Sequence, residues 1–204
     1  MNITSVQHHS IASLITKMKH VTLLQRDPMV TPVYIFKTAT IEVVTVLTSD
    51  IHPTQFYKLQ SSTDNNVLLQ KALLQRGIDL FELNGYLTLE IENNQYTLLP
   101  PIIEYQKQLT GEELPIIADG FHRVSLARMQ GRKEIQVLKI RNIPEEFSYP
   151  AYPNRWDEVR LDYVPSDPAQ KRKWKFSSDI AYAHYHDFSS AFPNIGKPRP
   201  TVKE

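Results

Sequence analysis

The sequence predicts an α/β or α+β fold, in which a mixed sheet is flanked by an N-terminal helix and strand and by an irregular C-terminal segment. Apolar, β-branched runs alternate with amphipathic segments between residues 33 and 140, as in chains that combine helices with a sheet. Hydrophobic residues form 41% of the 204-residue chain and charged residues 22%, so a full core can be buried. Proline and aromatic residues become frequent after residue 144, which predicts irregular structure.

The N-terminal part is expected to contain a helix and a buried strand. Apolar residues three and four positions apart predict a helix over about residues 5–20. Asp27-Pro28 breaks the chain. The run 41–47 is nearly all apolar and rich in β-branched residues, which predicts a buried strand that ends before His52-Pro53.

A second helix and a hairpin follow. Residues 66–76 have the apolar spacing of an amphipathic helix, and Gly77 is a typical helix stop. Residues 79–99 alternate in the manner of two strands, with Asn84-Gly85 or Asn93-Asn94 as the turn.

The central part predicts strands around one short helix. Strands are expected at 102–105, 115–118 and 135–140, a polar loop at 106–113 and a helix at 124–130. The helix would connect the last two strands as parallel neighbours.

We expect a single domain over residues 1–204, with a core at 45–143 and an irregular wrap at 144–204. The residues after Gly196 are expected to be a frayed tail.

Charge and composition exclude several classes of protein. The 23 basic and 22 acidic side chains give a net charge of +1, which argues weakly against a protein that coats nucleic acid. The chain has no cysteine, so disulfides, thiolate metal sites and cysteine nucleophiles are excluded. No apolar run reaches the ~18 residues of a membrane span, and residues 1–20 lack the pattern of a signal peptide. A cytoplasmic protein without a membrane partner is expected.

The most informative stretch is the junction of a strand and a helix at residues 116–130. Asp119-Gly120 ends the strand, and His122-Arg123 begins the helix. The first N–H groups of a helix lack partners and attract anions. Gly120 lets an anion approach the backbone, and Arg123 can bind phosphate with two N–H groups. Together these residues predict a phosphate-binding site.

An ordinary structural role would also explain these residues. Asp-Gly is a common turn sequence, Asp119 could cap the helix, and Arg123 could be a surface charge.

The pattern D-G-x-H-R at a strand-to-helix junction, followed by A-x-x-x-G and a strand that begins I-x-V, resembles the ParB/sulfiredoxin superfamily. The matching residues are Asp119, Gly120, His122, Arg123, Ala127, Gly131, Ile135, Val137 and Ile140. Residues 51–55 and 98–103 resemble two further elements of the superfamily, an early Pro-x-Gln/Glu and a proline before an apolar strand. The resemblance covers about residues 45–140 and implies a ParB/sulfiredoxin-like domain.

Within this superfamily the motif is most similar to that of the free serine kinases. The resemblance implies that ATP or ADP binds here, with Mg²⁺ at Asp119. The implied phosphate-binding residues are Gly120, Phe121, His122, Arg123 and Ser125.

The chain departs from the superfamily pattern at two positions. Sulfiredoxins have a cysteine where this chain has Phe121, so sulfinic acid reduction by that route is excluded. The kinases have a glutamate general base where Gln55 stands, and a glutamine cannot accept a proton as a carboxylate does. Glu104 or Glu42 could supply the carboxylate. The implied catalytic residues are Asp119, His122, Glu104 and Gln55.

The resemblance therefore implies an enzyme that transfers a phosphoryl group from ATP or ADP to a small hydroxyl substrate. A non-catalytic ParB-type module that binds a nucleotide or DNA, and a ParB-like nuclease, stay as alternatives. Gln55 favours the non-catalytic module. The near-neutral charge and the absence of a recognisable helix-turn-helix segment favour the enzyme and make nucleic acid the less favoured partner.

Three further features have structural and functional interpretations. His184 and His186 would share one face of a strand and could bind a metal ion, although surface or core histidines are more common. The basic run 171–175 could contact a nucleic acid backbone or a phosphate, or form a solvated face. The aromatic residues after 148 could stack on a nucleotide base or wrap the core, and Arg128 and Arg132 could lie near the site.

Overall fold

The computed structural model describes residues 1–24, 31–108 and 110–196. Its centre is a four-stranded mixed sheet with the order β3-β9-β7-β8. These strands are β3 (Thr40–Leu47), β7 (Ile102–Lys107), β8 (Glu113–Asp119) and β9 (Glu134–Arg141). β7 and β9 are parallel, and the other two pairs are antiparallel. The predicted α+β class is confirmed.

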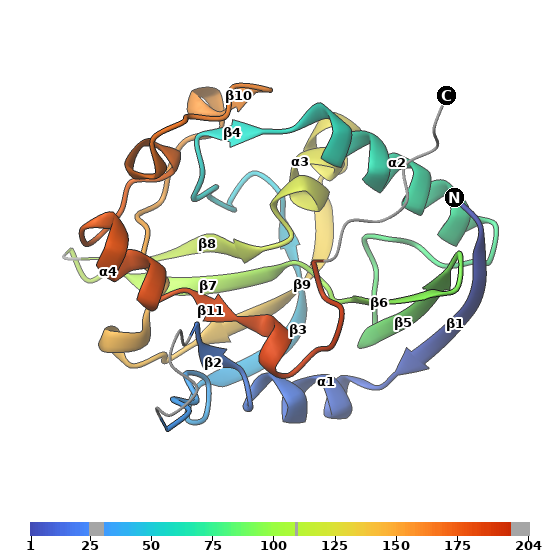
Figure 1. The fold of residues 1–204 in the computed structure, drawn as a ribbon, viewed down its shortest axis with the longest axis horizontal. Helices are drawn as coiled ribbons and strands as arrows, with labels where there is room; N and C mark the ends of the chain where they lie inside the picture. The colour runs from blue at the N-terminus through green and yellow to red at the C-terminus, as the bar shows by residue number, and fades with distance from the viewer. Residues whose placement is uncertain (25–30, 109, 197–204) are drawn as a thin grey trace.

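A second, antiparallel sheet lies beside the first (Figure 1). It has the order β1-β5-β6 and consists of β1 (Ile3–His9), β5 (Tyr86–Ile91) and β6 (Asn94–Leu98). Two short pairs fasten the C-terminal part of the chain to the N-terminal half. They are β2 (Thr22–Leu23) with β11 (His186–Asp187), and β4 (Tyr57–Lys58) with β10 (Arg160–Leu161).

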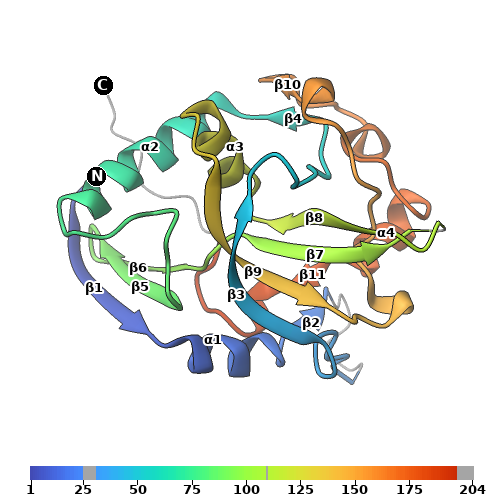
Figure 2. The same cartoon turned by 180° about the vertical axis from the view of Figure 1, so that it is seen from behind.

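The two faces of the central sheet pack against different elements, because successive side chains of a strand point to opposite faces. Ile103 and Val137 belong to a core shared with α2 (Gln60–Leu74) and α3 (Phe121–Met129). Ile102 and Leu138 belong to a core shared with α1 (Ile11–Met18) and the C-terminal segment. Figure 2 shows β3 and β9 from behind, with α3 at one side of them.

The predicted helix at 5–20 is wrong in its first part. Residues 3–9 form β1, which pairs antiparallel with β5, and the helix begins only after Ser10. The Ser10 hydroxyl accepts a hydrogen bond from the Ser13 N–H at 3.2 Å, so this side chain caps α1. The strand lacks an alternating pattern, because its less exposed residues Ile3, Val6 and His9 recur every third position and its pairing shifts register between Ile3 and Ser5. This spacing also fits a helical period.

The strand at 41–47 is confirmed as β3, but it lies at the edge of the sheet rather than in its interior. It pairs with β9 alone, and only Ile41 of its side chains is fully buried. It ends at Leu47, where the chain turns, before His52-Pro53. Asp27-Pro28 lies outside the described residues.

The second helix and the hairpin are confirmed with shifted boundaries. α2 begins at Gln60, six residues before the predicted start. The prediction started late because the first turns of the helix are polar and lack the apolar spacing of the later part. Gly77, with a φ of +72°, donates its N–H to the Leu74 carbonyl oxygen at 3.0 Å and ends it. The turn between β5 and β6 is Glu92-Asn93, both at positive φ.

The predicted parallel pairing of the two strands around α3 is wrong. β7 lies between β8 and β9, and β7 is the strand that runs parallel to β9. In the β7–β8 hairpin, β7 extends to Lys107 and β8 starts at Glu113, so both ends of the predicted loop at 106–113 are strand. Because the hairpin places β8 at the edge, the connection through α3 crosses β7 before it reaches β9.

The expectation of irregular structure after residue 144 is confirmed. This part consists of short 3₁₀ turns, β10, β11 and α4 (Ser178–Ala183), and it runs along one side of the molecule from β10 to β11 (Figure 1). The tail predicted after Gly196 lies outside the described residues. Within the part of the chain that is described, no helix is long and apolar enough to cross a membrane.

Candidate functional site

The junction of β8 and α3 depends on Gly120. Its φ is +84°, a left-handed conformation that favours glycine. A Cβ atom at this position would lie 2.8 Å from Arg123 Nη2 and 2.9 Å from Pro101 Cα. The Gly120 carbonyl oxygen accepts the N–H groups of Arg123 and Val124, at 3.0 and 3.1 Å. The glycine therefore both starts the helix and leaves room for the arginine beside it.

A pocket of about 230 Å³ opens at this junction. It is lined by residues 54–55, 97–99, 117–123 and 195–196, together with Asn66 and Arg172. The predicted residues Gln55, Asp119, Gly120, Phe121, His122 and Arg123 all contribute to its wall. The fold thus brings the early Pro-x-Gln element and the D-G-x-H-R motif to the same place.

Arg123 is a buried cation at this pocket, with 7% of its surface exposed. Its Nη1 donates to the Leu99 carbonyl oxygen, and its Nη2 lies 3.4 Å from Asp119 Oδ2. Burial lowers the pKa of Arg123, and the Asp119 carboxylate raises it. A guanidinium stays protonated at neutral pH, so the fold holds a positive charge under the glycine turn with a single, half-exposed carboxylate beside it.

His122 is neutral at physiological pH. Its Nε2 accepts the Leu59 N–H at 3.3 Å, which places the ring proton on Nδ1. Burial lowers the pKa of His122 to about 4, against the opposing effect of Asp119. The side chain can therefore donate one hydrogen bond but adds no charge.

Gln55 lies in the pocket with both ends of its amide occupied. Its Nε2 donates to the Tyr57 carbonyl oxygen at 2.7 Å, and its Oε1 accepts from Arg172 Nη2 at 3.3 Å. The amide is held in one orientation, and no carboxylate replaces it. Thr54 beside it donates to the Ile117 carbonyl oxygen at 2.9 Å.

The expected alternatives to Gln55 lie elsewhere. Glu104 points to the same face of β7 as Ile102, away from α3, and is fully buried. Its Oε2 accepts the Tyr149 N–H at 3.1 Å, and its Oε1 lies 2.7 Å from His186 Nδ1. Glu42, on β3, lies 3.9 Å from Lys139 Nζ. Among the described residues that line the pocket, Asp119 is the only carboxylate.

Ser125 is also outside the pocket. It is buried on α3, one turn into the helix, and does not line the pocket wall. The sequence prediction placed it there because it is close to the motif in the chain. The helical rotation carries its side chain away from the first turn.

Arg172 is the charged pocket residue that sequence reasoning did not single out. Its Nη1 donates to Thr54 Oγ1 at 2.8 Å, and its Cζ lies 5.6 to 5.9 Å from the centres of three aromatic rings, those of Tyr149, Trp174 and Tyr185. Burial lowers the pKa of Arg172, but the neighbouring tyrosines raise it and the net shift is upward. The basic run 171–175 was the available signal, yet nothing in it distinguished Arg172 from its exposed neighbours.

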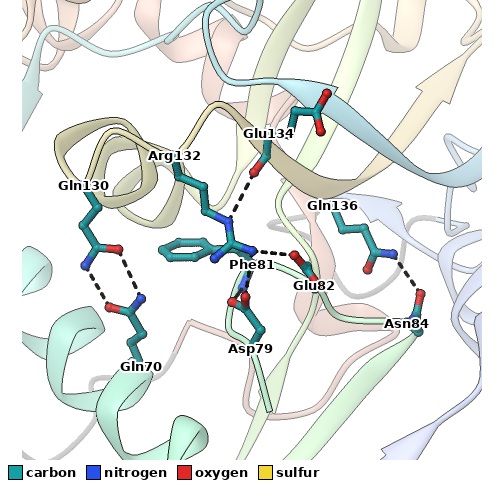
Figure 3. A network of polar contacts seen from close by, with 9 residues as sticks. All are labelled: Gln70, Asp79, Phe81, Glu82, Asn84, Gln130, Arg132, Glu134 and Gln136. Carbon is teal, nitrogen blue, oxygen red and sulfur yellow. Dashed lines mark hydrogen bonds and ion pairs between the residues drawn. The ribbon is translucent and has the colours of Figure 1, made fainter. Parts of the chain in front are cut away.

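Arg128 and Arg132 lie toward the other end of α3 and hold it in place. Figure 3 shows Arg132 between Asp79 and Glu82, at 2.7 and 2.5 Å. Gln70 of α2 and Gln130 exchange two amide hydrogen bonds, at 3.1 and 2.9 Å (Figure 3). This network fixes the C-terminal end of α3 against α2 and the 79–84 loop, and so fixes the direction of the helix at the pocket.

The other sequence candidates have structural partners. His184 Nδ1 lies 2.9 Å from the Ile180 carbonyl oxygen at the end of α4, so it does not share a strand with His186. No group of three histidine, aspartate or glutamate side chains that could hold a metal ion occurs in residues 1–24, 31–108 and 110–196. Trp156 stacks on Phe121 at 5.6 Å and donates to the Ile51 carbonyl oxygen at 2.7 Å, so it supports the first turn of α3 from behind.

One family model matches most of the chain. It is described as the ParB CE domain, and it covers residues 13–160. No curated protein and no solved structure matches the chain. The matched region includes the whole junction of β8 and α3, and it ends before Arg172.

Proposed function

Since the chain belongs to the ParB CE domain family, we propose that its pocket binds the phosphate groups of a nucleotide, ATP or ADP, and that the protein transfers a phosphoryl group to a small hydroxyl substrate. The observation that carries the proposal is the buried Arg123 guanidinium at the N-terminal end of α3. Buried cations need an anionic partner, and in the described part of the chain Arg123 has one, the partly exposed Asp119 at 3.4 Å.

The geometry of the junction suits a phosphate group. The first residues of α3, 121–123, line the pocket together with Gly120, so the positive end of the helix dipole lies at the pocket. Because Gly120 has no side chain, the Arg123 guanidinium can lie directly at this turn. A volume of about 230 Å³ is smaller than the roughly 300–1,000 Å³ of sites that enclose a whole small molecule. The pocket therefore fits the phosphate end of a nucleotide, with the base outside it.

Asp119 fits a Mg²⁺ ion that arrives with the nucleotide. Protein sites for Mg²⁺ often supply one or two carboxylates and leave the other positions to phosphate oxygens and water. Asp119 is a half-exposed carboxylate at the pocket wall and meets this requirement. Bound there, the ion would neutralise charge on the phosphates.

Phosphoryl transfer depends mainly on positioning and on charge stabilisation, which is what the chain's own residues offer. Arg123 and the helix N-terminus would hold the phosphates, and the His122 Nδ1–H would donate one further hydrogen bond. Asp119 is also the group in the pocket that could accept the proton of the hydroxyl substrate. Gln55 would orient a ligand without taking part in proton transfer.

A non-catalytic nucleotide-binding module is the second candidate. The observation that favours it is the fixed amide of Gln55. The free serine kinases, whose motif this chain resembles, have a glutamate base at that position. Such a module would bind the same phosphates with the same residues and release no product.

Product analysis separates the two candidates. The protein is incubated with Mg²⁺ and γ-labelled ATP, or β-labelled ADP, and a panel of small alcohols that includes serine. The enzyme proposal predicts a labelled phosphomonoester that disappears in Asp119→Asn, while nucleotide binding persists. Nucleotide binding with no labelled product from any alcohol would favour the non-catalytic module.

A further inference from the structure

The C-terminal segment supplies part of the pocket. Arg172, Ile195 and Gly196 line it, although the family match ends at residue 160. The chain is anchored on the way to Arg172 by the β4–β10 pair and by the Phe56 N–H, which donates to the Lys171 carbonyl oxygen at 3.1 Å. This wall of the pocket is therefore built by this chain's own extension.

The Arg172 side chain is held in a fixed position. Its two terminal nitrogens donate to Thr54 and Gln55, at 2.8 and 3.3 Å. Since a guanidinium has five N–H donors, these two bonds leave further donors for a ligand. The surrounding aromatic rings stabilise the cation without neutralising it.

The charges at the pocket do not balance. Two guanidinium groups, those of Arg123 and Arg172, line the same small pocket, and Asp119 is the one carboxylate among its described lining residues. Arg172 has no carboxylate within ion-pair distance in the described part of the chain. Asp119 already pairs with Arg123, so the uncompensated positive charge is that of Arg172. A phosphate group bound at Arg123 alone would leave Arg172 without an anionic partner.

We propose that Arg172 is a second phosphate-binding residue, which makes the pocket selective for a ligand with two linked phosphate groups, such as the diphosphate of ADP, over a ligand with one. This inference rests on the proposed phosphate site at Arg123. It adds a specificity-determining residue that comes from outside the matched family region.

The test compares pyrophosphate with orthophosphate, and ADP with AMP, by isothermal titration calorimetry without metal ion. The wild-type protein is expected to bind each diphosphate at least about tenfold more tightly than its monophosphate partner, the effect of one added charged hydrogen bond. Arg172→Gln is expected to remove most of this preference. Arg172→Lys keeps the positive charge but loses the paired N–H donors of the guanidinium, so this variant should retain part of the preference.

Lys173→Gln is the matched control. Lys173 is the next residue, 45% of its side chain is exposed, and it pairs with Glu158 on the surface. This variant removes the same charge and should keep the wild-type preference. Circular dichroism and thermal unfolding of each variant establish that the fold is intact, and Arg172→Lys provides the measurement if Arg172→Gln does not fold.

The outcomes distinguish a failure of the inference about Arg172 from a failure of the proposed phosphate site at Arg123. If the wild-type protein binds no phosphate ligand, the proposed phosphate site itself fails. If it binds them and Arg172→Gln or Arg172→Lys weakens diphosphate and monophosphate equally, Arg172 only positions Thr54 and Gln55, and the inference is overturned. An unchanged preference in the folded Arg172 variants overturns it as well.

Discussion

Gly120 and Arg123 depend on each other at the level of single atoms. The arginine can pass under the turn only because no Cβ fills that space. The space is filled by Arg123, the proposed phosphate-binding residue, so a side chain at position 120 would also displace that guanidinium. A substitution at Gly120 should therefore affect both folding and binding.

We predict that Gly120→Ala lowers the free energy of unfolding by clearly more than Gly131→Ala. Both glycines have positive φ, +84° and +69°, so both alanines carry the ~1–3 kcal/mol of left-handed strain. Only at Gly120 would the new Cβ meet Arg123 and Pro101, whereas nothing lies within 4 Å at Gly131. Urea unfolding measures both, and equal losses would mean that the close approach at Gly120 has no energetic consequence.

His122 makes a prediction about pH. Its folded pKa is about 4, below the ~6.5 of an unfolded histidine, so between these values the unfolded chain binds more protons. Its contribution to stability is then present above about pH 6.5 and is lost as the pH falls toward 4. Other groups also titrate in this range. The measurement therefore compares the change in the free energy of unfolding with pH between the wild-type protein and His122→Gln. An identical slope in both would contradict the assignment.

Gln55→Glu tests whether the site merely lacks a base. In this structure a carboxylate at position 55 would lie against Arg172 and would lose the hydrogen bond to the Tyr57 carbonyl oxygen. We expect a several-fold loss of ADP affinity and no gain in phosphoryl transfer, because the new charge pairs with Arg172. A gain in labelled product would instead show that the carboxylate is free to act as a base.

At the scale of elements, one face of β7 packs against the helix at the candidate site, and the other face packs against the C-terminal segment. Ile103 faces α3 and Glu104 faces the C-terminal segment, so a shift by one residue along this strand changes the assigned role. The Glu104 and His186 side chains, 2.7 Å apart and fully buried, join β7 to β11. They hold the C-terminal segment on the sheet.

We predict that Glu104→Ala destabilises the fold by about 3–5 kcal/mol, because it leaves His186 and the Tyr149 N–H without their buried partner. Glu42→Ala, which removes an exposed carboxylate 3.9 Å from Lys139, should change stability by less than about 0.5 kcal/mol. The milder Glu104→Gln should fold and bind ADP with wild-type affinity. If a folded Glu104→Gln protein lost ADP binding, Glu104 would have a role at the nucleotide site.

At the scale of the whole molecule, the sequence predicted local features better than their pairing. The strands at 41–47, 102–105, 115–118 and 135–140 were recognisable because apolar, often β-branched residues are dense in each of them. Their order was not, because the hairpin β7–β8 and the parallel pair β7–β9 depend on contacts between distant segments. The edge position of β3 and the face of Glu104 follow from that order.

The candidate site divides in the same way. Residues 119–123 could be predicted because one glycine turn brings them together within five positions of the chain. Arg172, Asn66 and Thr97 could not, because each comes from a different element and no local pattern marks it. The irregular C-terminal segment has no periodicity from which its path to the pocket could be inferred.

The most direct test of the central claim is thermal unfolding in the presence of ATP, ADP, CTP and GTP, each with and without Mg²⁺. A nucleotide at about 100 times its Kd stabilises by about 2.7 kcal/mol, which is a shift of about 5–10 °C for a chain of this size. We predict such a shift with ATP or ADP in the wild-type protein and in Arg155→Met, an exposed control, and its loss in Arg123→Lys. A shift with CTP alone would contradict ATP or ADP as the ligand, and no shift with any nucleotide would contradict the phosphate site at Arg123.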